Sequence, residues 1–434
     1  MLGRRRGALL APLVVGWLAL GATPAAAAQQ EAIDSGDTAW ILVSAALVMF
    51  MTPGLAFFYG GLVRSKNVLA TIMHAFVALG VVTITWTVVG YTLAFGPDIA
   101  GIVGGLDFFG FKDVTGEPSD YAPTVPHIAF AIFQMMFAII TPALIAGAFA
   151  ERMRFSAYVA FIAAWSILVY APVAHWVWGG GFLGADGIGA LDFAGGTVVH
   201  INAGAAALVA ALMVGRRRGW PSDAGGMLPH NIPFVVLGAS MLWFGWFGFN
   251  GGSALASNGD AAVAFSVTHI ATAAAIFGWI LPEWRQHGKP TAVGAATGAV
   301  AGLVAVTPAA GFIRPWSAII LGFVSGAVCY YAVRLKWRWR YDDSLDVVGV
   351  HFVGGIVGAL LTGVFATEDG LVYGGGVAQL GRQAAGVVIT IVWAVVATFV
   401  ILKVIDIAVG LRVDEDAETT GLDLSQHGEG AYVA

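Results

Sequence analysis

The chain has 434 residues, of which 58% are hydrophobic and only 11% are charged, and its mean hydropathy is +0.82. Soluble domains carry about 25% charged residues, so this composition excludes a soluble globular protein and predicts a chain solvated by a lipid bilayer. With a formal net charge of −5 the chain shows no basic patch that suggests nucleic acid, and its single cysteine, Cys329, excludes an intrachain disulfide and a cysteine metal centre.

Residues 1–28 are typical of a cleavable signal peptide. Three arginines (Arg4, Arg5 and Arg6) are followed by the apolar run ALLAPLVVGWLALG, and small residues up to Ala28 offer cleavage sites. Cleavage would leave the mature N-terminus outside the cytoplasm. The alternative interpretation is a first transmembrane helix that stays attached.

Residues 29–410 contain long apolar runs, broken by glycine, proline or charge, that predict about eleven transmembrane helices. The expected segments are 40–59, 68–95, 128–150, 155–177, 197–214, 234–249, 261–281, 291–306, 316–333, 347–367 and 379–409. We therefore expect an all-α integral membrane protein. Residues 411–434 form an acidic tail that we expect on the cytoplasmic side, and on composition alone it is typical of a solvated, disordered end.

Basic residues fall almost entirely in alternate loops, which fixes the expected topology. The loops predicted to lie outside the cytoplasm hold only Lys112, Arg314 and Arg382. Because lysine and arginine are enriched in cytoplasmic loops, we expect the N-terminus outside and the C-terminus inside.

An internal repeat relates the two halves of the chain. The stretch DFAGGTVVHINAG at 192–204 matches DSLDVVGVHFVGG at 343–355, with an acid eight positions before a histidine in both. Likewise FFYGG ends the first span and GFNGG ends the sixth. Each half has five spans, and because five is an odd number, the two halves enter the membrane from opposite sides. The sequence therefore predicts an inverted repeat plus one extra helix.

The two repeated histidines, His200 and His351, each lie within an apolar span. An ionisable group in such a place usually faces a partner or a cavity. A lone histidine would most simply be a core residue, but equivalent positions of inverted halves can meet at the shared axis. Two neutral imidazoles in contact would share one hydrogen and offer one donor and one acceptor to a small polar solute. The other histidines, such as His175 near the outer interface, have no repeat partner and receive no functional role.

Three predicted outer helix ends carry aromatic side chains: Phe137 in FQMMF, Trp178 in HWVWGGG, and WFGFNGGS, which adds the hydroxyl of Ser253. Such aromatics can form an interfacial belt, but together they would also attract a cation. Asp192 can cap the N-terminus of the fifth span, and its negative charge can also add to the electric field at the aromatic outer helix ends.

The motifs DFAGGTVVHINAG, WFGFNGGS, FYGGLVRSKN, GVHFVGGIVGALLTG and the tail GLRVDEDAETTGLDLSQHGEGAY resemble the ammonium transporter (Amt/Mep/Rh) family in its bacterial Amt branch. The resemblance covers essentially the whole chain after the signal peptide. It implies a multi-pass protein of the bacterial inner membrane that transports ammonium or ammonia and is not an enzyme.

The resemblance also implies roles for single residues. Trp178, Phe137 and Ser253 match the external ammonium-recruiting site, with Asp192 as the acid that supports it. Phe137 and Phe249 match a stacked gate, and His200 and His351 match the twin histidines of the pore. Members of the family are homotrimers, and their tail helps a PII-type signalling protein (GlnK) to plug the pores.

Two other function classes were weighed. An intramembrane enzyme or metal site lacks H-E-x-x-H and G-x-S-x-G signatures, and each repeat acid lies about 12 Å of helix rise from its own histidine. We therefore expect no metal and no cofactor. An ammonium sensor of the same fold is the alternative function, although sensors usually carry an added signalling domain.

Overall fold

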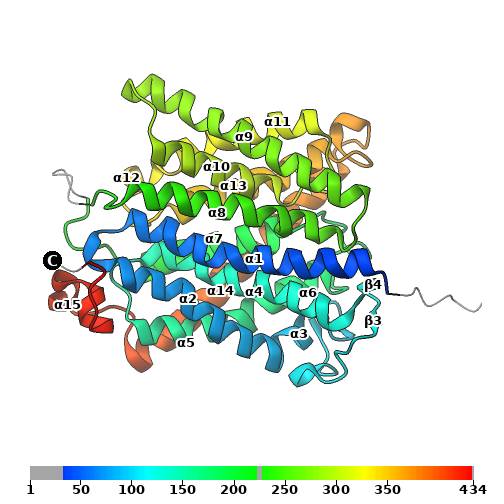
Figure 1. Cartoon of the computed structure of the whole chain (residues 1–434), viewed down its shortest axis with the longest axis horizontal. Helices are drawn as coiled ribbons and strands as arrows, with labels where there is room; N and C mark the ends of the chain where they lie inside the picture. Colours follow the sequence, from blue (N-terminus) through cyan, green and yellow to red (C-terminus); the bar gives the residue numbers. More distant parts are fainter. Residues whose placement is uncertain (1–32, 222–226, 433–434) are drawn as a thin grey trace, which may run out of the picture.

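Long apolar helices that run from one end of the molecule to the other make up most of the fold (Figure 1). The computed structural model describes residues 33–221 and 227–432. The predicted signal peptide lies outside the described residues. Within them, ten helices are long and apolar enough to cross a membrane, and a shorter apolar helix, α10, accompanies them.

Every one of the predicted spans coincides with helical structure, and four of them contain a π-helical stretch. The helices are α1 (Ser35–Leu62), α2 (Val68–Thr85), α3 (Tyr91–Phe95), α4 (His127–Phe149), α5 (Phe155–Trp165), α6 (Ala171–Trp178), α7 (Asn202–Val214), α8 (Ile232–Gly251), α9 (Gly259–His287), α10 (Ala292–Val306), α11 (Pro315–Ala332), α12 (Leu335–Trp339), α13 (Val353–Phe365), α14 (Ala378–Val409) and α15 (Glu415–Thr420). The π-helical stretches within the spans are η2 (Trp86–Gly90), η4 (Ser166–Tyr170), η5 (Gly196–Ile201) and η7 (Val348–Phe352), and another, η9 (Asp423–His427), lies in the tail. Short 3₁₀ turns are η1 (Ser65–Asn67), η3 (Phe109–Phe111), η6 (Gly252–Ala254) and η8 (Leu371–Tyr373).

Polar side chains begin several of these helices, because the first amides of a helix lack partners within it. Asp34 accepts a hydrogen bond from the Asp37 amide at α1, and Asn231 accepts one from Phe234 at α8. Helices α9 and α14 end at a glycine with positive φ, Gly288 and Gly410. These local signals explain why the apolar runs become helices with defined ends.

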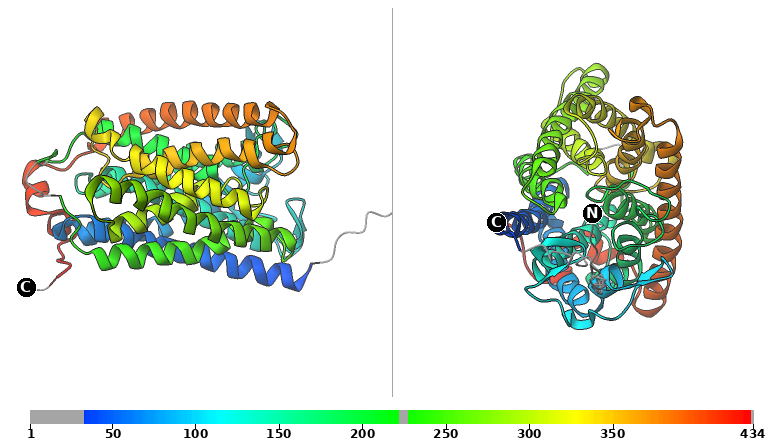
Figure 2. Two further views of the ribbon diagram at one scale, coloured as in Figure 1. Left: turned by 90° about the horizontal axis from the view of Figure 1, so that it is seen from above. Right: turned by 90° about the vertical axis from the view of Figure 1, so that its right-hand side faces the viewer.

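The pseudo-equivalent first and sixth spans, α1 and α8, lie side by side (Figure 1). A Cβ atom on Gly54 of α1 would lie 2.9 Å from the Met241 Cβ, and one on Gly238 of α8 would overlap the backbone of Phe58. Glycine is required at both places because the two backbones approach this closely. On another side of the molecule α14, the span outside the repeat, runs along the bundle (Figure 2).

The segment between α3 and α4 contains two small antiparallel hairpins. Strand β1 (Asp98–Ile99) pairs with β2 (Val103–Gly104), and β3 (Pro118–Ser119) pairs with β4 (Ala122–Pro126). This segment lies at the same end of the molecule as the start of α1, since the Asp34 amide donates to the Thr124 carbonyl. The tail lies at the opposite end (Figure 1).

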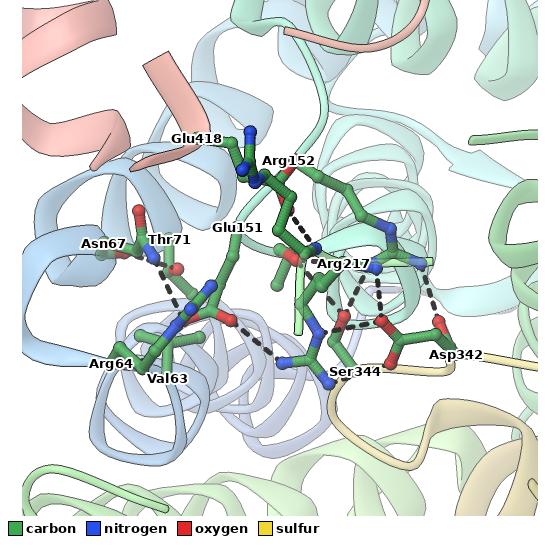
Figure 3. A network of polar contacts seen from close by, with 12 residues as sticks. Val63, Arg64, Asn67, Thr71, Glu151, Arg152, Arg217, Asp342, Ser344 and Glu418 are labelled. Atoms are coloured by element: carbon green, nitrogen blue, oxygen red, sulfur yellow. Dashed lines mark hydrogen bonds and ion pairs between the residues drawn. The ribbon is translucent and has the colours of Figure 1, made fainter. Parts of the chain in front are cut away.

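Four loops and the tail meet at that opposite end through a network of buried ion pairs (Figure 3). Glu151, after α4, binds Arg64 at 3.0 Å and Arg217 at 2.9 Å, and Arg217 also binds Asp342 at 2.8 Å. Burial alone would raise the pKa of the Glu151 carboxyl, but Arg217 and Arg64 outweigh burial and hold this pKa at about 2. All four loops are among those predicted to be cytoplasmic.

The tail is docked on these loops rather than detached. The Glu418 carboxylate accepts from the Arg218 amide at 2.7 Å and from Arg412 at 2.6 Å. Asp423 accepts from the Ala70 amide at the start of α2 at 2.9 Å. The solvated, disordered end that the composition suggested is therefore not what the structure shows.

We expect Glu151→Gln to lower the melting temperature of the detergent-solubilised protein by several degrees, since breaking a buried pair costs about 3–5 kcal/mol. The folded pKa of about 2 lies below the ordinary value of 4.5, so the stabilisation is complete above the ordinary value and is lost as pH falls from there towards 2. The difference in melting temperature between the two proteins should therefore narrow in thermal melts from pH 7 to pH 3. Glu368→Gln, the same change on an exposed side chain, is the control; an equal effect of both would contradict the prediction.

Candidate functional site

The repeated histidines meet inside the bundle. His200 lies in η5 and His351 in η7, both at most 4% exposed, and their Nδ1 atoms are 3.2 Å apart. A neutral imidazole has one donor and one acceptor nitrogen, so one ring carries its hydrogen on Nδ1 and the other on Nε2. The pair therefore has one Nε2 that accepts and one that donates.

Close packing of the two repeats brings the rings together. A Cβ on Gly204 would overlap Phe352, the residue after His351, and a Cβ on Gly355 would lie 3.2 Å from the His200 Cβ. His200 is further held by stacking on Trp246, with ring centroids 5.3 Å apart. Among the described residues, the Nε2 atom of His200 has no hydrogen-bond partner, so it is available to a solute.

A narrow cavity of about 10 Å³ lies beside the two rings. Its lining is apolar apart from the imidazoles and the indole of Trp246: Met51, Leu55, Phe58, Ile140, Leu144, Val199, His200, Leu242, Trp246, Phe249, Val300 and His351. A single water needs about 10–15 Å³ of this kind of volume, so this cavity has room for at most one small molecule and is too small for a hydrated ion.

A larger cavity of about 270 Å³ opens at the end of the bundle that carries the hairpins. It is lined by Phe95, Tyr121, Phe130, Gln134, Phe137, Val177, Trp178, Phe193, Ser253 and Leu255. The three residues expected from the sequence at the outer mouth, Trp178, Phe137 and Ser253, thus share one cavity. The rings of Phe137 and Trp178 are edge-to-face at 6.1 Å, and the Ser253 hydroxyl donates to the Phe249 carbonyl at 2.8 Å.

Two phenylalanines separate the cavities. Phe137 lines the larger cavity, which we name the outer cavity because the sequence predicts that this end lies outside the cytoplasm. Phe249 lines the smaller, inner cavity, and the centroids of the two rings are 4.2 Å apart at a tilt of 34°. Phe249 also stacks on His200, with centroids 6.1 Å apart. The outer cavity, the ring pair and the histidines therefore follow one another in space.

Asp192 acts on the backbone rather than on the cavity. Its buried carboxylate accepts four hydrogen bonds of 2.7–3.1 Å from backbone amides at the start of η5. The donors are the amides of Gly195, Gly196, Thr197 and Val198. Its carbonyl accepts from the Trp178 indole at 2.9 Å. Asp343 does the same in the second repeat for the amides of Val347 and Val348. Of the roles weighed for Asp192, the geometry favours that of a cap that also fixes Trp178.

The comparisons with known proteins agree over almost the whole chain. The model of the Ammonium Transporter Family matches residues 39–432. The chain belongs to the ammonium transporter family.

Three proteins that resemble this chain are between 30% and 51% identical to it. An ammonium transporter of Bacillus subtilis is 51% identical over 408 residues, which covers 92% of this chain and 99% of the relative. Mep2 of Candida albicans has a similar structure, with a TM-score of 0.84, 39% identity and coverage of 92% and 91% of the two chains. A sensor Amt protein reaches the same TM-score at 30% identity and covers 90% of this chain.

Several residues of this family member's candidate site escaped the sequence analysis. Trp246, the first residue of the motif WFGFNGGS, stacks on His200, but nothing in the motif distinguished it from the neighbouring aromatic residues. Gln134 lay within FQMMF but carried no repeat or charge. Tyr121 reaches the outer cavity from the hairpin segment, where no periodic pattern places a side chain.

Proposed function

We propose that this member of the ammonium transporter family recruits NH₄⁺ at the outer cavity, removes its proton and conducts NH₃ past the two histidines. The observation that supports this most is the contact between His200 and His351 beside a passage of about 10 Å³. A passage this narrow and apolar suits a small uncharged molecule that can form hydrogen bonds.

Recruitment rests on the aromatic outer cavity. The faces of Trp178 and Phe137 attract a cation that has lost part of its water shell, and the Ser253 oxygen accepts a hydrogen bond from it. Asp192 acts through the backbone: its carbonyl fixes the Trp178 indole and its carboxylate fixes the start of η5.

Deprotonation avoids the cost of burying a charge. Transfer of an isolated cation into an apolar passage costs many kcal/mol, whereas neutral NH₃ passes Phe137 and Phe249 and then bonds to the histidines. The released proton crosses separately, so that net transport carries charge. K⁺ has no proton to lose and meets the full cost of desolvation.

The proposal also covers the membrane location, the assembly and the partner of the protein. The protein lies in the bacterial inner membrane with its N-terminus outside, assembles as a homotrimer, and presents its docked tail to a PII-type signalling protein (GlnK) on the cytoplasmic side. No catalytic or cofactor chemistry is invoked.

A sensor of the same fold is the second candidate, and the similarity to a sensor Amt protein at a TM-score of 0.84 favours keeping it. Growth of an ammonium-transport-deficient strain at low ammonium separates the two functions. Rescue by this chain supports transport, whereas binding without rescue supports sensing.

Trp178→Leu tests the outer site. We expect the KM for methylammonium uptake into proteoliposomes to rise about thirtyfold, because a desolvated cation–π contact is worth roughly 2 kcal/mol. Trp316→Leu, at an indole that is 45% exposed, is the matched control and should leave KM unchanged. An unchanged KM in Trp178→Leu would remove Trp178 from the site.

A further inference from the structure

His175 has a hydrogen-bond pattern that differs from that of the pore histidines. It lies in the last turn of α6, and its side chain is 0% exposed. Its Nδ1 atom is 2.9 Å from the Ala94 carbonyl oxygen, and its Nε2 atom is 2.9 Å from Oδ1 of Asp98. Both ring nitrogens therefore face oxygen atoms.

The chemistry of these oxygens decides the protonation of the ring. A carbonyl oxygen only accepts, so Nδ1 must carry a hydrogen. The hydrogen bond from His175 and one from the Gly101 amide hold the pKa of the Asp98 carboxyl below its ordinary value, so this carboxylate is ionised and also accepts. The His175 Nε2 atom faces this carboxylate at 2.9 Å, so oxygen atoms hold the buried ring on both sides.

This hydrogen-bonded pair lies next to the tryptophan of the outer cavity. Trp178 follows His175 by three residues, so the two side chains are neighbours on α6. The helix ends at Gly179, where an added Cβ would lie 2.7 Å from the His175 Nδ1 atom. The imidazole thus packs under the end of the helix from which the Trp178 side chain extends.

Asp98 belongs to the first outer hairpin, which holds the same turn at further points. The Trp176 indole donates to the Ile102 carbonyl at 2.7 Å, and the Phe182 amide donates to the Gly101 carbonyl at 3.1 Å. Among these contacts only the one between Asp98 and His175 involves an ionised side chain, the Asp98 carboxylate, and hydrogen bonds to a charged group are the strongest of this kind.

We propose that Asp98 and His175 are positioning residues for ammonium binding: the hydrogen bond between them fixes the last turn of α6 and thereby sets the place of Trp178 in the outer cavity. This inference rests on the proposed function, in which Trp178 contacts the cation. Neither residue lines the cavity or contacts the substrate.

The Asp98 side chain is 40% exposed, so its charge could also attract ammonium from a distance. Asp107→Asn removes the same charge from an exposed position in the same outer segment and serves as the matched control. A positioning role predicts an effect of Asp98→Asn only, whereas attraction by charge predicts similar effects of both.

The experiment measures KM and the maximal rate of methylammonium uptake into proteoliposomes. We expect Asp98→Asn to raise KM about fivefold and to leave the maximal rate within about twofold, since a charged hydrogen bond that acts on binding is lost. His175→Gln should raise KM similarly, and the double variant should be no worse than the worse single variant. Asp98→Asn alone decides the matter if the buried His175 variant does not fold.

The outcomes separate this inference from the proposed function. The positioning role is overturned if Asp98→Asn leaves KM unchanged or lowers only the maximal rate, or if Asp107→Asn raises KM equally. If Trp178→Leu still raises KM in these cases, the proposed outer site stands. If Trp178→Leu also leaves KM unchanged, the proposed outer site fails, and the inference fails with it.

Discussion

Replacing His351 by alanine is expected to lower ammonium transport at least about tenfold and to let potassium through. The variant loses one of the two hydrogen-bonding rings that receive NH₃, and a lost hydrogen bond to a desolvated solute costs on the order of 1–3 kcal/mol. It also leaves space beside His200, where the native cavity of about 10 Å³ excludes hydrated ions. Currents recorded on solid-supported proteoliposomes after ammonium and after potassium pulses measure both effects.

A second histidine provides the control. His269→Ala changes an exposed imidazole of α9, a helix that lies outside the pore, and should leave both currents as in the native protein. His200→Ala should behave like His351→Ala because the two rings act as one pair. Native flux and native selectivity in both pore variants would disprove the assignment of the pore.

Asp192→Asn is expected to abolish transport and to lower the melting temperature. The native carboxylate accepts four backbone hydrogen bonds, whereas an amide offers one acceptor oxygen and turns its NH₂ group toward amides that also donate. Two amides left without an acceptor cost about 2–6 kcal/mol. Because Asp192 holds both the start of η5 and the Trp178 indole, His200 and the outer cavity are displaced together.

Thermal melts and uptake assays on the same preparations measure these two effects. Asp186→Asn, an exposed acid in the preceding loop, should change neither. Asp343→Asn should destabilise less than Asp192→Asn, since Asp343 accepts from two amides only. A fully stable and active Asp192→Asn protein would show that these hydrogen bonds are dispensable.

The helices and the histidine pair could be predicted because their signals lie in the sequence itself. Apolar runs of membrane-spanning length predict helices regardless of their neighbours. The matched spacing from Asp192 to His200 and from Asp343 to His351 indicates a pseudo-symmetric pair, whose Nδ1 atoms are 3.2 Å apart in the structure.

Other features depend on contacts between segments that are distant in the sequence. Strands of two residues, such as β1, are too short to show an alternating pattern, so the hairpins were missed. The proposed role of His175 could not be predicted from the sequence, because it depends on Asp98, which the fold places beside the His175 Nε2 atom. The docking of Asp423 on the Ala70 amide likewise joins residues that no local pattern connects.

The central claim is that an uncharged molecule passes between the outer cavity and the paired histidines. Current recording on native proteoliposomes tests it most directly, with equal pulses of ammonium and potassium in the same preparation. We predict a saturable current with ammonium and none with potassium. A potassium current as large as that with ammonium, or an ammonium current that persists unchanged when both His200 and His351 are alanine, would contradict it.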